Sequence, residues 1–127
     1  DNLKRINAAV SVDMRHERAT PENAGELFAD CDIVVEAFDD PACKKMLVEA
    51  YRSSGKLLVA ASGIAGWGNS DRIKIHKISN NFYVVGDLVS GIGPETPPMG
   101  PCVNIAAAKQ ADIVLSHVLN SIKDDEI

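Results

Sequence analysis

Apolar and polar positions divide the chain into segments with different periods. Residues 10–17 alternate between apolar and polar side chains, the period of two expected of a half-buried strand at a sheet edge. Residues 32–38 are a nearly continuous apolar run rich in β-branched residues, and residues 56–62 repeat the pattern of a buried strand. Strands that helices cover on both faces have this pattern, so we expect both runs to be central strands of a parallel sheet.

Two helix starts are marked by a capping residue followed by proline. Thr20 and Pro21 supply a hydroxyl for the free amides and a fixed φ for a short helix. Asp40 and Pro41 repeat the signal before a helix that Gly55 ends. Because this second helix joins the two buried strands, the order strand, helix, strand predicts a right-handed parallel crossover.

The pattern changes after the second buried strand. Residues 72–76 alternate, the asparagines at 80–81 offer a turn, and residues 82–85 are apolar, which predicts an antiparallel hairpin. Gly-Pro at 100–101 then opens a long helix. Its expected buried face consists of Val103, Ala107, Ala111, Val114, Val118 and Ile122. We therefore expect one α/β domain, residues 1–127: a three-layer, mostly parallel sheet with a C-terminal hairpin and a long final helix.

Composition and charge exclude several classes of protein. With 127 residues, 46% hydrophobic and 24% charged, the chain is typical of a globular domain and not of a disordered or collagen-like one. Its 18 acidic against 13 basic residues, a net charge of -5, provide no basic surface for nucleic acid. No apolar run reaches the roughly 18 to 20 residues that span a bilayer, and no secretory signal opens the chain, so we expect a cytoplasmic protein without a membrane partner.

Candidate ligand contacts lie where the first buried strand ends. Open α/β sheets bind ligands beyond the carboxyl ends of their strands, where loops and helix amino termini meet. Asp39 follows this strand, and a carboxylate there can hold Mg²⁺ against nucleotide phosphates. Asp40 is the candidate cap of the next helix. The alternative is that both aspartates serve only the turn and the helix dipole.

The end of the second buried strand is rich in glycine. Gly63, Gly66 and Gly68 would let a ligand approach the backbone, but they form neither of the common phosphate-binding motifs, and a sharp turn into the hairpin is the alternative. Trp67 either faces a partner or folds over the core, which we favour. Cys102, at the start of the last helix, is either an activated thiol or, as we favour, a small residue packed under the helix.

Five segments carry a more specific pattern through their order and separation. They are Arg-Ile-Asn at 5–7, Thr-Pro-Glu-Asn at 20–23, Asp-Cys-Asp-Ile-Val-Val-Glu-Ala-Phe-Asp-Asp at 30–40, Val-Ala-Ala-Ser-Gly-Ile-Ala-Gly-Trp-Gly at 59–68 and Gly-Pro-Cys-Val at 100–103. In this order they resemble the ThiF/MoeB/HesA family of ubiquitin-activating-enzyme-like adenylyltransferases, most closely its short bacterial ThiF-like members. The resemblance spans nearly the whole chain.

The resemblance implies a Rossmann-like fold and an enzyme that uses Mg-ATP to adenylate the C-terminal glycine carboxylate of a ubiquitin-like sulfur carrier, usually in thiamine biosynthesis. In the family, an Asp-x-Thr-Asp-Asn segment assists this reaction. Its second aspartate falls on Asp39, which is therefore the candidate catalytic and metal-binding residue. Phe38, Asp40, Ser62 and Gly63 are the other candidate nucleotide contacts. Family members are commonly homodimers, so a homodimer is expected.

The chain also departs from the family pattern. Glu36, Phe38 and Asp40 replace the first aspartate, the threonine and the asparagine of the motif. The three cysteines form no CxxC pair, so no zinc is expected. The family's glycine-rich nucleotide loop would precede Asp1, so we expect the C-terminal portion of the domain, inactive by itself. Two alternatives stay open: half of an NAD-dependent dehydrogenase domain, and a non-catalytic dimerisation module.

Overall fold

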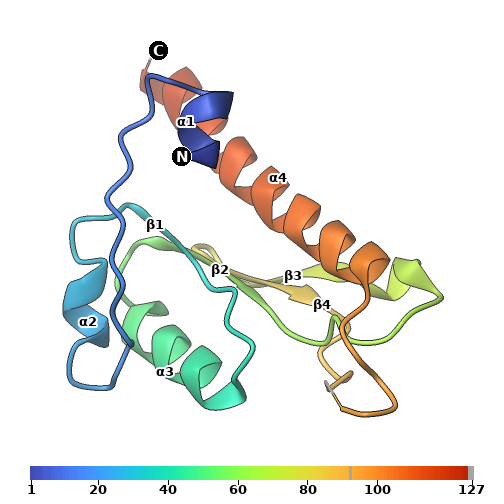
Figure 1. Ribbon diagram of the computed structural model, residues 1–127. Helices are drawn as coiled ribbons and strands as arrows, with labels where there is room; N and C mark the ends of the chain where they lie inside the picture. The colour runs from blue at the N-terminus through green and yellow to red at the C-terminus, as the bar shows by residue number, and fades with distance from the viewer. Residues whose placement is uncertain (92, 126–127) are drawn as a thin grey trace.

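The computed structural model describes residues 1–91 and 93–125. These residues form a four-stranded mixed sheet with helices on both faces. The strands are β1 (Ile33–Val35), β2 (Leu57–Ala61), β3 (Lys74–Ser79) and β4 (Phe82–Gly86), in the spatial order β1-β2-β4-β3. Strands β1, β2 and β4 are parallel, and β3 is antiparallel to β4. Both the mostly parallel sheet and the hairpin predicted from the sequence are confirmed (Figure 1).

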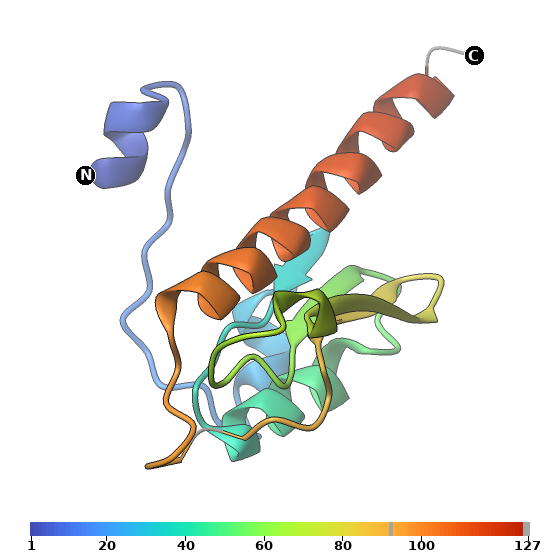
Figure 2. The ribbon, with the colours of Figure 1, turned by 90° about the vertical axis from the view of Figure 1, so that its right-hand side faces the viewer.

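Helices cover both faces of this sheet. Helices α2 (Ala24–Leu27) and α3 (Pro41–Tyr51) lie on one face, and the long helix α4 (Gly100–Asp125) crosses the other (Figure 1). A short 3-10 helix, η1 (Ser70–Arg72), precedes β3. Helix α1 (Asn2–Ile6) stands apart from the sheet at the end of the N-terminal segment (Figure 2). The predicted three-layer arrangement with a long final helix is therefore confirmed.

Strand β2 joins two hydrophobic clusters because its side chains alternate between the two helical layers. Leu57 and Val59 pack with residues of α4 and β4. Leu58 packs on the opposite face with Leu47 and Tyr51 of α3. Every residue of β2 is buried. The predicted central, doubly covered strand is thus confirmed at β2.

Strand β1 is shorter and less covered than predicted. It comprises three residues, and within the described ranges it pairs with β2 alone, so it lies at an edge of the sheet. Val35 is 47% exposed. The backbone leaves the ladder soon afterwards because the Phe38 amide donates to the Glu36 side chain instead of to a neighbouring strand. The prediction of a central strand over 32–38 is therefore wrong in both length and position.

The predicted edge strand at residues 10–17 is not formed. This segment is exposed along its length and runs toward α2 without strand structure (Figures 1 and 2). Alternation alone does not make a strand, because the backbone also needs a neighbour to share its hydrogen bonds. The cap at Thr20 is present: its hydroxyl accepts from the Asn23 amide at 3.3 Å, and the Asn23 side chain accepts from the Thr20 amide at 2.7 Å. Helix α2 itself begins later, at Ala24.

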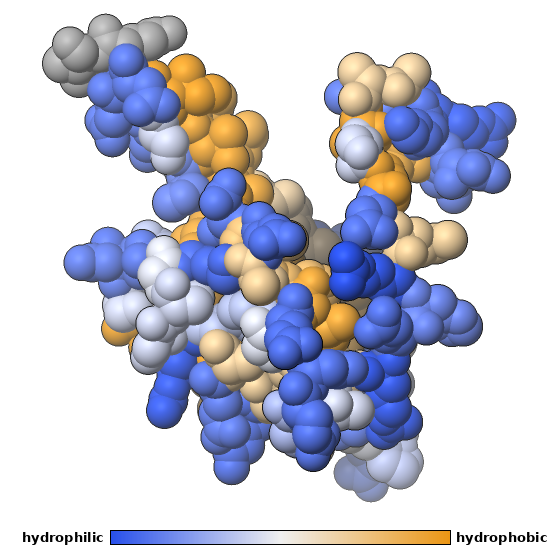
Figure 3. Space-filling view, turned by 90° about the vertical axis from the view of Figure 1, so that its left-hand side faces the viewer, coloured by the Kyte–Doolittle hydropathy of each residue, from blue (hydrophilic) through white to orange (hydrophobic). Residues whose placement is uncertain are grey.

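Helix α4 buries a different face from the predicted one. Its buried residues are Cys102, Ala106, Gln110 and Ile113. The predicted residues are exposed or half-buried, and apolar side chains follow the outer side of α4 in Figure 3. The buried face contains small side chains that allow close approach to the sheet, and Gln110, which donates to the Glu36 carbonyl at 3.1 Å. Among the residues that the structure describes, no helix is long and apolar enough to cross a membrane.

Candidate functional site

Asp39 and Asp40 lie together in the turn between β1 and α3 but have different surroundings. Asp40 caps α3: its carboxylate accepts from the Ala42 amide at 2.9 Å and from the Cys43 thiol at 3.6 Å. Pro41 occupies the first turn, so the predicted cap is confirmed. Asp39 is exposed, and no hydrogen bond or ion pair holds its carboxylate within the described part of the chain. Asp39 is thus available to a ligand, whereas Asp40 is engaged with the helix.

A buried ion pair lies behind this turn. Glu36 is 1% exposed, and the Lys44 ammonium lies 3.1 Å and 3.4 Å from its two carboxylate oxygens. The same carboxylate accepts from the Phe38 amide at 2.6 Å and from the Ala61 amide at 3.4 Å. Lys44 also donates to the Ala61 carbonyl at 3.1 Å. These contacts tie the carboxyl ends of β1 and β2 to the first turns of α3.

Glu36 and Lys44 are not among the site residues predicted from the sequence. One signal was present, because a glutamate inside an apolar strand run needs a partner if it is buried. Its partner could not be read from the spacing, since residues 36 and 44 are separated by a turn and the start of a helix. The pair borders a cavity of about 310 Å³, which Ser62 also lines. Ser62 therefore lies at the same edge of the sheet as the candidate aspartates.

Gly63 has a packing role at this edge. Its φ is +78°, and a Cβ there would overlap the Asp87 carboxylate and approach the Leu88 nitrogen to 2.5 Å. Its carbonyl accepts from the Asp87 amide at 2.9 Å. The bare Cα of Gly63 thus faces the turn after β4, and this contact supports the alternative that the glycines serve a sharp turn.

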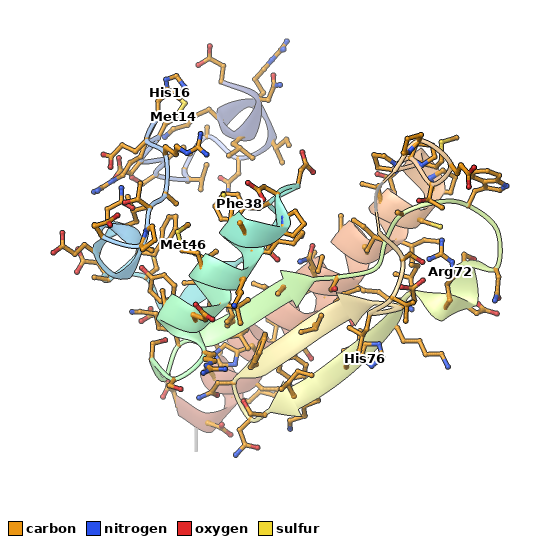
Figure 4. The ribbon with its side chains drawn as sticks, turned by 90° about the horizontal axis from the view of Figure 1, so that it is seen from below. Met14, His16, Phe38, Met46, Arg72 and His76 are labelled. Carbon is orange, nitrogen blue, oxygen red and sulfur yellow. The ribbon has the colours of Figure 1, made fainter. Side chains whose placement is uncertain are left out.

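Phe38 borders a second cavity, of about 560 Å³, between the N-terminal segment and α2. Figure 4 shows Phe38 at the start of α3, toward the segment that carries Met14 and His16. The cavity has an apolar part formed by Leu27, Phe28 and Phe38. Its charged lining is mainly acidic, with Asp13, Glu17, Glu26 and Asp30 against Arg15. Such a lining repels phosphate groups and leaves the apolar part for an uncharged ring.

Arg72 lies beyond the carboxyl ends of β2 and β4, well apart from Phe38 (Figure 4). Its guanidinium lies 2.8 Å from the Asp87 carboxylate and donates to the Ala65 carbonyl at 2.8 Å. Partial burial raises the pKa of the Asp87 carboxyl, but hydrogen bonds from Ser90, Val89 and Arg72 outweigh this effect and hold the pKa well below its usual range. Arg72 is therefore occupied by structural contacts.

Cys102 and Trp67 both lie near Arg72. The structure supports the favoured prediction for Cys102 and contradicts the one for Trp67. The Cys102 thiol is buried in the core beneath α4, 3.5 Å from the Arg72 guanidinium, which supports the packing alternative. Trp67 is 68% exposed, so its predicted place over the core is wrong. The physical reason is the backbone on either side, because Gly66 and Gly68 adopt φ values of +79° and +74° and turn the loop outward.

A metal ion would find one suitable ligand at this edge. Within residues 1–91 and 93–125, no group of three His, Cys, Asp or Glu side chains gathers as a metal cage. Mg²⁺ in nucleotide sites commonly takes one or two protein carboxylates, with waters and phosphates supplying its other ligands. The exposed, unpaired carboxylate of Asp39 fits this mode of binding.

Comparison with known proteins gives the family. A sequence model of the ThiF family matches residues 1–123. The chain belongs to the ThiF family. The predicted resemblance is thereby confirmed, and the parallel sheet with its hairpin and final helix is consistent with a Rossmann-like ThiF domain. No solved structure gives a significant match.

Curated relatives of this ThiF-family chain are fungal proteins named adenylyltransferase and sulfurtransferase UBA4. The protein of Candida glabrata is 29% identical over 122 residues, covering 92% of this chain and 28% of the relative. That of Aspergillus clavatus is 26% identical over 140 residues, covering 97% of this chain and 27% of the relative. That of Kluyveromyces lactis is 25% identical over 108 residues, covering 81% of this chain and 24% of the relative. The chain spans about a quarter of the length of these relatives.

Proposed function

We propose that this ThiF-family chain is part of an ATP-dependent adenylyltransferase that activates the C-terminal carboxylate of a ubiquitin-like sulfur carrier. The observation that carries the proposal is the exposed Asp39 carboxylate at the carboxyl edge of the parallel strands. The neighbouring carboxylate, that of Asp40, is already bound to the Ala42 amide as the cap of α3. The adenylyltransferase activity in the names of the relatives supports it. The family match favours this function over the dehydrogenase alternative.

The reaction joins two groups of the same charge. An oxygen of the carrier carboxylate attacks the α-phosphorus of ATP, an acyl-adenylate forms, and the bond to the β-phosphate breaks to release pyrophosphate. Repulsion between the carboxylate and the triphosphate opposes this attack, so a fixed, oppositely charged environment lowers the barrier. Mg²⁺, when bound, supplies positive charge against the phosphates. The role of Asp39 is to hold that ion, and Phe38, Asp40, Ser62 and Gly63 remain candidate nucleotide contacts.

The proposal includes the setting of the reaction. We place it in thiamine-type biosynthesis in the cytoplasm, with the sulfur carrier as partner and a homodimer as the assembly. ATP and Mg²⁺ are the small molecules required, and neither zinc nor nucleic acid has a role. Sedimentation of the intact protein tests the assembly, since a monomer at high concentration would remove the homodimer from the proposal.

The test is ATP–pyrophosphate exchange by the intact protein with a ubiquitin-like carrier. Asp39→Asn keeps the shape of the side chain and removes its charge, so exchange is expected to fall about 100-fold. Asp71→Asn is the matched control, because Asp71 is also an exposed aspartate but lies in η1. This control is expected to retain full exchange.

Other outcomes would support the alternatives. Unchanged exchange in the Asp39→Asn protein would remove Asp39 from the reaction. A wild-type protein without exchange toward any carrier would favour the non-catalytic dimerisation module. Tight NADH binding without a response to ATP would favour the dehydrogenase.

A further inference from the structure

The Glu36–Lys44 ion pair is largely removed from water, and burying two charges is not the usual way to stabilise a fold. Glu36 is 1% exposed, and the Lys44 side chain is 26% exposed. Removing two charges from water is costly, and replacing a buried pair with apolar residues is often neutral or stabilising. This pair is fully hydrogen-bonded, since no buried side-chain nitrogen or oxygen lacks a partner in the described residues. The groups that the pair contacts indicate its role.

Those contacts fix the turn that carries Asp39 from both sides. On the preceding side, the Glu36 carboxylate accepts from the Phe38 amide at 2.6 Å. On the following side, Lys44 of α3 binds the same carboxylate and the Ala61 carbonyl at the end of β2. Asp39 lies between these two anchors and has no hydrogen bond of its own in the described residues. The position of the Asp39 backbone in this turn therefore depends on the pair.

A third element makes the anchor rigid. The Glu36 amide donates to the Val59 carbonyl at 2.8 Å, and the Glu36 carbonyl accepts from the buried Gln110 side chain of α4 at 3.1 Å. One residue thus connects β1, β2, α3 and α4 at the carboxyl edge of the sheet. A displacement of Glu36 would move the Asp39 turn relative to β2 and its Ser62 end.

We propose that Glu36 and Lys44 are positioning residues that aim the Asp39 carboxylate for the adenylation reaction. The inference rests on the proposed function, because it assigns these residues a role that acts through Asp39. In this role neither residue touches a reacting group itself. A purely structural pair would affect the amount of folded protein, whereas a positioning pair affects the turnover of each folded molecule.

Four variants of the intact protein separate these roles. Lys44→Met leaves Glu36 buried without its cation, and Lys44→Arg restores a cation of similar length. Glu36→Gln replaces one acceptor oxygen with an NH₂ group, which cannot accept from the Ala61 amide while the other oxygen accepts from Phe38. Lys45→Met is the matched control, because Lys45 is the next residue, is 77% exposed and pairs only with Glu49 at 3.7 Å in the described chain.

We expect a split between kcat and KM in ATP–pyrophosphate exchange, with rates expressed per folded molecule. Lys44→Met and Glu36→Gln should lower kcat about 100-fold, the effect of a displacement of about 1 Å, while the KM for ATP changes less than about threefold. Lys44→Arg should recover kcat to within about fivefold of wild type. Lys45→Met should stay within about twofold, as expected for an exposed pair.

The decisive measurement is a double-mutant cycle with Asp39→Asn. If the pair acts through Asp39, adding Lys44→Met to Asp39→Asn should lower kcat by less than about threefold more, because there is no carboxylate left to aim. Full additivity of the two losses, with a lowered melting temperature, would show a structural pair and overturn the inference. If Lys44→Met does not fold, Glu36→Gln serves in the same cycle. A wild-type protein without exchange would overturn the proposed function together with this inference, whereas an active wild type with additive losses would overturn the inference alone.

Discussion

At the scale of single residues, Gly63 has no space for a side chain. Its φ of +78° disfavours any other residue, and a Cβ would overlap the Asp87 carboxylate. We expect Gly63→Ala to lower the free energy of unfolding by about 2 to 4 kcal/mol, from backbone strain and steric overlap together. Gly25→Ala is the control, because a Cβ at Gly25 in α2 meets nothing within 4 Å.

Urea unfolding of both variants checks this prediction. Gly25→Ala should be neutral or stabilising by at most about 1 kcal/mol, since alanine favours helix more than glycine does. Equal stability of the two variants would contradict the proposed crowding at Gly63. A loss at Gly63 would show that this glycine is required for the approach of the turn after β4, independently of any ligand.

The candidate site was predictable from the sequence where a residue acts locally. Asp40 followed by Pro41 identifies a helix cap by residue type and position alone, and the structure confirms it. Glu36 was visible as a charge in an apolar run, but its partner Lys44 meets it only after the chain has turned into α3. Trp67 was misplaced because its exposure depends on the φ angles of its two glycine neighbours and not on its own hydrophobicity.

At the scale of elements, the Arg72–Asp87 pair ties η1 to the turn after β4, and Arg72 extends this link to the loop after β2 and to α4. Arg72 ends η1, Asp87 follows β4, and the same guanidinium contacts Ala65 after β2 and Cys102 at the start of α4. Asp87→Asn would leave Arg72 without its counter-charge in a half-buried place. We expect this variant to lower the free energy of unfolding at pH 7 by about 1 to 3 kcal/mol.

The pH dependence of this loss has a definite sign. The pKa of Asp87 is lowered in the folded protein, so the carboxylate stabilises the fold above the pKa of the unfolded chain, about 3.9. This contribution disappears as the pH falls below that value and the folded carboxyl becomes protonated. The stability difference between wild type and Asp87→Asn should therefore be constant from pH 7 to about pH 5 and shrink below about pH 4. Asp71→Asn, at an exposed position, is the control, and a difference that grows in acid would contradict the prediction.

Whether a segment is a helix or a strand was easier to predict than which neighbouring element it packs against or pairs with. Helix α4 was predictable from its Gly-Pro start and its apolar period, but it has apolar residues on two sides, and only contact with the sheet decides between them. Cys102 and Ala106 are small enough to approach β2, so they form the buried face. Likewise, residues 10–17 alternate as an edge strand does, yet they form no strand, because strand formation also depends on a neighbouring backbone.

At the scale of the whole molecule, charge limits what these residues can do with ATP. The chain has a net charge of -5. At the candidate edge, Lys44 is paired with Glu36 and Lys45 with Glu49, while Asp39 and Asp40 add negative charge. Within the described residues, the turn between β1 and α3 therefore has no unpaired lysine to offset a triphosphate, whose negative charge requires a cation.

The consequence is a prediction for residues 1–127 produced alone. They should catalyse no ATP–pyrophosphate exchange, because aiming Asp39 does not compensate for the missing positive charge around the phosphates. The measurement compares this chain with the intact protein under the same conditions, after circular dichroism has shown that the isolated chain is folded. Exchange by the folded isolated chain within about tenfold of the intact protein would mean that one metal-binding carboxylate and backbone dipoles suffice for the phosphates. Activity confined to the intact protein would mean that the cations for the triphosphate come from outside these residues.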